Sequence, residues 1–351
     1  MAPSCDRRIS NVRPGRYRRF AERGPGRRPP SAVGPRRYRG VVPVLPSVGP
    51  AAPTPVLAGT STTPPTGEAR GSVVELAVRV PLDPAPVLAS TAARAVPGVE
   101  SVGDGAVRRL VDLGGGHVAV TAAVTAEGVV LRTDAPVPAA ALARLADRWF
   151  GLADDLAPVH AALGADPVLG PLLAARPLLR VAGHPDGFET AVQAVLTQQV
   201  SLRAGATTGG RLAAAYGRPH ASGLRTFPTP TDVADVDPVA LQAVLRVPHA
   251  RARAVHALAV ACADGLVLAP GVDVAAVRER LLAVPGVGPW TADVVALRAL
   301  GDRDAYPAGD LVLRRALGVE HPRDAAAAGR TWAPWRAFAA THLWASRAVP
   351  V

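Results

Sequence analysis

Two features of this 351-residue chain have residue types and spacing that could do chemistry. The stretch "VPGVGPW", residues 284–290, places Gly286 and Gly288 on either side of one valine, and Asp310 follows Gly288 by 22 residues. A helix N-terminus presents unpaired backbone N–H groups and a partial positive charge, and glycine lets an anion approach them closely. Such a turn can bind phosphate without any basic side chain, and the aspartate supplies a carboxylate at the start of a helix.

Each feature also has an ordinary structural interpretation. A turn of this kind can merely connect two helices, and "AVPGV" occurs twice, at 95–99 and at 283–287. The first copy continues with Glu100, whose carboxylate would repel phosphate, so we expect a helix-to-strand turn there. Asp310 precedes "LVLRRAL" and is a good helix N-cap. Capping and function are compatible if one carboxylate oxygen caps the helix while the other takes part in the reaction.

Charge and cysteine content narrow the class of protein. All 39 basic residues are arginine; residues 1–70 hold 13 of them with three acidic residues, and the rest holds 26 with 25 acidic residues. The net charge of +11 therefore belongs mostly to the first 70 residues and is weak support for nucleic-acid binding. Two cysteines, Cys5 and Cys262, exclude a four-cysteine iron–sulfur or zinc site. No apolar run approaches the ~18 residues of a membrane span, so we expect a cytoplasmic protein without membrane contact.

Three parts follow from the pattern along the chain. Residues 1–70 are rich in Arg, Pro and Gly and predict a disordered tail and linker, either a DNA-tethering arm or an extension without a role. Residues 71–155 predict a small α+β domain with a strand at 73–80, two or three strands over 107–134, and helices at 85–96 and 138–152. Residues 156–351 predict an all-α bundle, with helical patterns at 187–217, 237–245, 250–265, 274–283, 291–301, 309–318 and 330–346.

Three separated motifs in the expected order carry a family resemblance. Residues 281–318, "LLAVPGVGPWTADVVALRALGDRDAYPAGDLVLRRALG", resemble the helix-hairpin-helix, Gly/Pro-rich loop and aspartate signature of DNA glycosylases. Residues 187–217 and "WAPWRAFAATHLW" at 332–344 are similar to the AlkA type, 3-methyladenine DNA glycosylase II. The resemblance runs from about 73 to 347. It implies an antiparallel-sheet α+β domain followed by a helix-hairpin-helix glycosylase bundle.

The resemblance also implies roles for individual residues. Asp310 matches the catalytic aspartate, and Trp290 and Trp344 match aromatics of the base pocket. Val294 stands where some AlkA-type enzymes have a pocket tyrosine, and Gln199 matches the side chain that fills the gap left by a flipped base, where some relatives have leucine. The DNA-contacting hairpin maps onto Pro285, Gly286, Val287, Gly288 and Thr291, and the carbonyls that hold a monovalent cation in some relatives map onto Leu282, Val284 and Val287. No other cofactor is implied.

The chemistry expected from these residues is hydrolysis of an N-glycosidic bond. An N3- or N7-alkylated purine is a good leaving group and a cation that favours the faces of Trp290 and Trp344. Asp310 would stabilise an oxocarbenium-like sugar and orient or deprotonate water. For Trp332 and Trp335 we expect core packing instead. Double-stranded DNA with alkylated bases is the expected partner, and a monomer the expected state.

The absence of lysine predicts a monofunctional enzyme. Glycosylase/lyases of this superfamily form a Schiff base with a lysine at the position of Trp290, and this chain contains no lysine. The alternatives are a helix-hairpin-helix glycosylase with another base specificity, a non-catalytic DNA-binding clamp, and an arginine-tailed chromatin protein that depends on residues 1–70.

Overall fold

The computed structural model of the chain describes residues 74–347, so the tail predicted at 1–70 lies outside the described residues. The N-terminal part of the described region contains a sheet and two helices. Its elements are β1 (Val74–Val78), α1 (Pro84–Ala92), β2 (Glu100–Gly103), β3 (Ala106–Asp112), β4 (His117–Thr125), β5 (Gly128–Thr133) and α2 (Ala139–Phe150). The α+β fold predicted for this part is confirmed.

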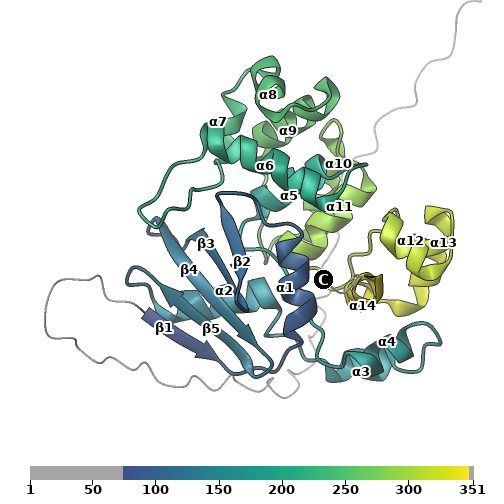
Figure 1. Cartoon of the computed structure of the whole chain (residues 1–351). Coiled ribbons are helices and arrows are strands. Elements are labelled where there is room, and N and C mark those ends of the chain that lie inside the picture. The colour runs from purple at the N-terminus through teal and green to yellow at the C-terminus, as the bar shows by residue number, and fades with distance from the viewer. Residues whose placement is uncertain (1–73, 348–351) are drawn as a thin grey trace, which may run out of the picture. The chain divides into compact units, whose positions relative to one another are not determined.

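The sheet is antiparallel and has five strands in the order β1-β5-β4-β3-β2 (Figure 1). The sequence pattern predicted three or four strands, and the short edge strand β2 makes the count five. Gly98 lies between α1 and β2 with a φ of +82°, a left-handed conformation that glycine adopts without strain. The first "AVPGV" copy is therefore the helix-to-strand turn that its Glu100 led us to expect.

Helix α2 shows how the sequence builds this part. Its buried residues recur at helical spacing, and Leu142, Leu145 and Trp149 pack with Val87 of α1 into the core of the sheet. Gly151 ends the helix in the left-handed conformation typical of a C-terminal cap.

The remainder of the described chain is helical, as predicted. Its elements are α3 (Ala157–Leu163), α4 (Leu169–Ala175), α5 (Gly187–Leu196), α6 (Leu202–Tyr216), α7 (Pro230–Ala234), α8 (Pro238–Leu245), α9 (His249–Ala263), α10 (Val274–Ala283), α11 (Pro289–Val295), the π-helical turn η1 (Ala296–Leu300), α12 (Leu311–Leu317), α13 (Pro322–Ala328), the 3-10 turn η2 (Gly329–Trp332) and α14 (Arg336–Arg347). None of these helices has the length and apolarity needed to cross a membrane.

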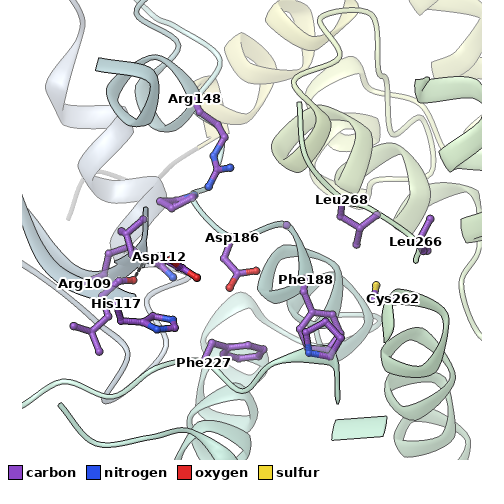
Figure 2. Close-up of a pocket in the computed structure, with 15 residues that line it drawn as sticks. Arg109, Asp112, His117, Arg148, Asp186, Phe188, Phe227, Cys262, Leu266 and Leu268 are labelled. Atoms are coloured by element: carbon purple, nitrogen blue, oxygen red, sulfur yellow. Dashed lines mark hydrogen bonds between the residues drawn. The ribbon is translucent and has the colours of Figure 1, made fainter. Parts of the chain in front are cut away.

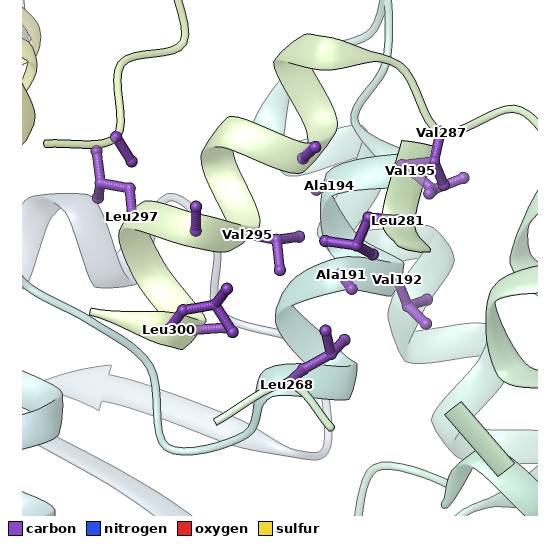
Figure 3. Close-up of a cluster of buried hydrophobic side chains, with 14 of the residues drawn as sticks. Ala191, Val192, Ala194, Val195, Leu268, Leu281, Val287, Val295, Leu297 and Leu300 are labelled. Atoms are coloured by element: carbon purple, nitrogen blue, oxygen red, sulfur yellow. The ribbon is translucent and has the colours of Figure 1, made fainter. Parts of the chain in front are cut away.

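Helix α5 lies at the centre of the helical core. Figure 3 shows its Ala191, Val192 and Val195 among Leu281 of α10 and Val295 of α11. The helical pattern at 187–217 is two helices and not one, because the backbone turns at residues 197–201 before Ser201 caps α6.

The C-terminal helices return to the earlier ones. Helix α14 packs against both α12 and α4. Trp332 is buried and its indole N–H donates to Asp166 Oδ2 at 2.7 Å, while Trp335 meets Phe338 edge to face. The core packing predicted for these two tryptophans is confirmed.

Candidate functional site

The Asp310 carboxylate begins helix α12. Its Oδ1 accepts hydrogen bonds from the amides of Val312 at 2.9 Å and Leu313 at 3.0 Å. These are N-cap bonds, so the structural interpretation of Asp310 holds for one oxygen. The second oxygen, Oδ2, takes no part in the cap.

Two indole groups converge on this carboxylate from different helices. Trp290 at the start of α11 donates from Nε1 to Asp310 Oδ2 at 3.0 Å. Trp344 of α14 donates from Nε1 to Oδ1 at 3.1 Å. All three side chains are half-buried. The structure thus brings together the predicted catalytic aspartate and the two predicted pocket tryptophans, although they are 20 and 34 residues apart along the chain.

Two arginines that the sequence reading missed lie in the electrostatic field of Asp310. The Arg298 guanidinium is 5.6 Å from the centre of the Trp344 ring. Burial lowers its pKa well below the usual value, and Arg94 lowers it further, while Asp310 opposes the shift. Burial also lowers the pKa of Arg94 to about 10, and Asp310 again opposes the shift. The site therefore combines one carboxylate with two cations. Of the two arginines, only Arg298 contacts a predicted site residue, Trp344, and lies within the signature at 281–318.

The hairpin between α10 and α11 combines buried and exposed residues. Val284 and Val287 are buried, and the Val287 amide donates to the Val284 carbonyl at 3.0 Å. Gly286 has a φ of +86°, and a Cβ there would lie 2.5 Å from the Ala254 side chain of α9. A Cβ at Gly288 would meet nothing within 4 Å. The two glycines thus serve different needs: Gly286 a left-handed turn against α9, and Gly288 an open approach to the backbone.

The start of α11 has donors to offer. Gly288 is the N-cap, and no side chain of the described residues caps this helix. The helical backbone continues through η1, since Ala296 keeps right-handed dihedral angles. The first turn of α11 therefore lacks a side-chain cap from the described residues for its backbone N–H groups, of which Pro289 has none, and an uncapped helix start is an arrangement that binds anions.

The remaining predicted residues lie in or near the hairpin and helix α11, or in the turn between α5 and α6. Gln199 is exposed, in the turn between α5 and α6, with a φ of +59°. Thr291 is buried in the first turn of α11, and Val294 is half-buried against the helical core. Pro285 is exposed at the hairpin tip, and Leu282 is exposed at the end of α10.

No side-chain metal site accompanies the hairpin. Within residues 74–347, no three or more His, Cys, Asp or Glu side chains gather in a way that could hold a metal ion. The carbonyls of Leu282, Val284 and Val287 are a separate case, since their donors are backbone atoms.

A cavity of about 310 Å³ lies elsewhere, between the sheet and the helices (Figure 2). Arg148, Asp186, Phe188, Phe227 and Cys262 are among its lining residues. None of the predicted site residues lines it. Burial raises the pKa of the Cys262 thiol to about 12, so this cysteine is a poor nucleophile at neutral pH.

A buried ionic network beside this cavity links the sheet to α5. Arg109 of β3 contacts Glu100 of β2 at 3.0 Å and Glu189 of α5 at 2.5 Å. It also lies 2.7 Å from the ring of His184. The sequence reading found no chemistry in the α+β domain, and this network was missed because Arg109 and Glu189 are 80 residues apart.

Comparisons with known proteins agree with the two-part architecture. A family model for the AlkA N-terminal domain matches residues 73–186, and a model for the HhH-GPD superfamily of base excision DNA repair proteins matches residues 192–323. The chain is 35% identical over 273 residues to DNA-3-methyladenine glycosylase 2 of Escherichia coli, a match that covers 75% of this chain and 94% of that protein.

A longer relative and a solved structure extend the comparison. The chain is 42% identical over 299 residues to a Mycobacterium tuberculosis protein named probable bifunctional transcriptional activator/DNA repair enzyme AlkA. That match covers 79% of this chain and 58% of the relative, so the chain spans less than two thirds of the relative's length. The fold is shared with 3-methyladenine DNA-glycosylase from Archaeoglobus fulgidus, with a TM-score of 0.65 at 19% identity over 77% of this chain and 97% of that chain.

Proposed function

Because the chain belongs to the AlkA family of helix-hairpin-helix DNA glycosylases, we propose that it hydrolyses the N-glycosidic bonds of alkylated bases in duplex DNA. The substrates are 3-methyladenine, 7-methylguanine and related bases, and the product is an abasic site. The observation that carries this proposal is the convergence of Trp290 and Trp344 on the Asp310 carboxylate.

Asp310 is the catalytic carboxylate of the proposed reaction. Its Oδ1 is held by two amides and one indole, so the carboxylate is oriented before substrate arrives. Its Oδ2, which accepts from one indole, retains a lone pair for the reaction. An alkylated purine leaves readily, and the sugar then acquires oxocarbenium character that a fixed carboxylate stabilises. The same oxygen orients or deprotonates the attacking water.

The two tryptophans differ as binding sites for a positively charged base. The Arg298 guanidinium already lies near the Trp344 ring and lessens the attraction of this ring for a second cation. We therefore assign cation–π binding of the base chiefly to Trp290. Val294 lies one helical turn beyond Trp290 and leaves the pocket wider than a tyrosine at this position would.

The hairpin supplies the grip on DNA. Amides at the uncapped start of α11 bind a backbone phosphate, with Pro285, Gly286, Val287, Gly288 and Thr291 forming the contact segment. Gln199, exposed in a left-handed conformation, fills the gap when the base leaves the stack. The protein acts on duplex DNA as a monomer.

A monovalent cation fits the hairpin carbonyls by their chemistry. Leu282, Val284 and Val287 would contribute neutral oxygens, which suit a singly charged hard cation better than a transition metal. The Val284 carbonyl already accepts the Val287 amide, so a cation would share this oxygen. Such an ion would stiffen the hairpin and would take no part in bond cleavage.

The reaction stops at the abasic site. Schiff-base chemistry needs an amine nucleophile, and all 39 basic residues of the chain are arginine. Trp290 occupies the position at which lyases of the superfamily carry their lysine.

Base release from methylated duplex DNA tests the proposal. We expect 3-methyladenine and 7-methylguanine among the released bases, and strand breaks only after a separate hot-alkali step. Borohydride should trap no protein–DNA adduct. Release of a different class of base would favour another specificity on this fold, strand breaks without alkali would contradict the monofunctional assignment, and duplex binding without any release would favour a clamp.

A further inference from the structure

Gln198 joins the two segments that contact DNA in the proposed function. We propose that it is a positioning residue that couples the turn carrying Gln199 to the hairpin, so that the plug enters the duplex in register with the phosphate grip. The inference rests on the proposed function and adds a residue to which the sequence reading gave no role.

Both protons of the Gln198 side-chain amide are used across a long sequence separation. Its Nε2 donates to the Gly286 carbonyl at 3.0 Å and to Thr291 Oγ1 at 3.0 Å. One acceptor lies at the hairpin tip and the other in the first turn of α11. A single side chain of the α5–α6 turn thus contacts both ends of the segment that presents the Gly288 amide.

The contact fixes the orientation of the hairpin tip. The peptide between Gly286 and Val287 is bonded at both ends, since its carbonyl accepts from Gln198 and its amide donates to the Val284 carbonyl. Val284 and Val287 anchor the turn in the core through their side chains, whereas Gly286 and Gly288 have no side chain to hold the peptide at the tip. Loss of the Gln198 amide would release one end of this peptide.

The turn itself is anchored on its other side. Arg251 of α9 donates from its guanidinium to the Gln198 carbonyl at 2.7 Å. The Thr197 hydroxyl donates to the Gln193 carbonyl at 2.8 Å. Gln199, directly after these anchors, holds a φ of +59°, a conformation that is unfavourable for a residue with a side chain. The conformation that exposes Gln199 therefore depends on contacts that Gln198 makes on both sides.

A coupling role makes a prediction that simple stabilisation does not. Extruding a base is less costly when the base is unpaired or mismatched. A residue that positions the plug therefore matters most for a fully paired lesion. A residue that only stabilises the fold affects paired and unpaired lesions alike.

The test uses single-turnover base release from two duplexes. Each carries one 7-methylguanine, opposite cytosine in one duplex and opposite an abasic-site analogue in the other. We expect Gln198→Ala to lower the rate constant about ten-fold on the paired lesion, equal to about 1.4 kcal/mol, and less than about three-fold on the unpaired lesion. Affinity for undamaged duplex should change less than about two-fold, since the phosphate contacts are backbone amides.

Partner and control variants make the result specific. Thr291→Val removes one acceptor with little change in volume and should show the same selective loss on the paired lesion. The double variant Gln198→Ala/Thr291→Val should lose no more than Gln198→Ala alone. Gln242→Ala removes the same type of side chain from α8 and should have no effect. Among residues 74–347, the Gln242 side chain has a hydrogen bond only with His249.

The failure of this inference differs from the failure of the proposed function. A Gln198→Ala protein that matches wild type, or that loses equally on the paired and the unpaired lesion, overturns the coupling. A wild-type protein that releases no base from either duplex overturns the proposed function and the coupling with it.

Discussion

At the scale of single residues, the site depends on how the two oxygens of Asp310 are shared. Oδ1 carries three hydrogen bonds, two from amides of α12 and one from Trp344, and Oδ2 carries one from Trp290. The residue types were predictable because the order of motifs resembles a known family. The division of the oxygens was not predictable, since it depends on the direction from which each indole approaches.

Replacing each tryptophan separates its N–H group from its aromatic face. Trp290→Phe keeps a ring but removes a donor to the carboxylate, and hydrogen bonds to charged groups contribute about 1.5–3 kcal/mol. We expect about a ten-fold or greater fall in the single-turnover rate constant for base release, with little change in duplex affinity.

The aromatic face is tested by truncation. Trp290→Ala should also reduce the preference for cationic 7-methylguanine over an uncharged lesion, by more than Trp344→Ala does, because Arg298 already lies near the Trp344 ring. Trp335→Ala is the matched control, since Trp335 packs against Phe338 and makes no hydrogen bond to Asp310. Equal loss of preference in both alanine variants would contradict the assignment to Trp290.

At the scale of elements, the hairpin assigns different tasks to its two glycines. Gly286 needs a left-handed backbone close to α9, whereas Gly288 is extended and faces open space. The sequence indicated a phosphate-binding turn but could not tell these tasks apart, since the distinction comes from Ala254 on another helix. The same limit explains why 187–217 was predicted as one helical stretch: Thr197–Val200 has no proline or glycine to mark the break.

Alanine substitutions distinguish the two tasks. Gly286→Ala should lower the free energy of unfolding by about 1–3 kcal/mol, because a Cβ there is strained and collides with Ala254. Gly288→Ala should leave the melting temperature within a few degrees of wild type yet weaken binding to duplex DNA several-fold. Thermal melts and fluorescence anisotropy with a labelled duplex measure the two effects. Unchanged affinity in Gly288→Ala would contradict phosphate binding at this amide.

At the scale of the whole molecule, the distribution of charge bears on DNA binding and the buried Arg109 network bears on stability, and the total charge says little about either. The net +11 lies mainly in residues 1–70, so we expect the described region to grip DNA through amides and not through a basic surface. The two-part fold was predictable from periodicity. The Arg109 network was not, because the adjacent Arg108 and Arg109 of β3 give no sign of which one will face buried glutamates.

This network makes stability depend on pH. Burial raises the pKa of Glu189 from 4.5 to about 7, and Arg109 only partly offsets the shift because one guanidinium faces two carboxyl groups. The folded state therefore holds a proton that the unfolded chain releases at lower pH. The stabilisation from this group is complete below pH 4.5 and is lost as the pH rises through about 7.

Glu189→Gln, which cannot ionise, isolates this effect. The free energy of unfolding of wild type minus that of the variant should fall by up to about 3 kcal/mol between pH 5 and 8, from about 1.4 kcal/mol per pKa unit. Urea titrations across this range measure it. Glu75→Gln, at an exposed ion pair with Arg132, is the surface control and should change stability much less, because exposed ion pairs contribute little. A flat difference for Glu189→Gln would mean that the carboxylate is ionised in the folded protein across this range and would contradict the raised pKa.

The comparison of wild type with Asp310→Asn tests the central claim most directly. Asparagine caps a helix as well as aspartate does, so the variant should fold and bind duplex DNA as wild type does. It cannot stabilise a developing cation or accept a proton from water, so single-turnover release of 7-methylguanine should fall by about 100- to 10,000-fold. A variant that still released the base at the wild-type rate would reduce Asp310 to a helix cap and contradict the account.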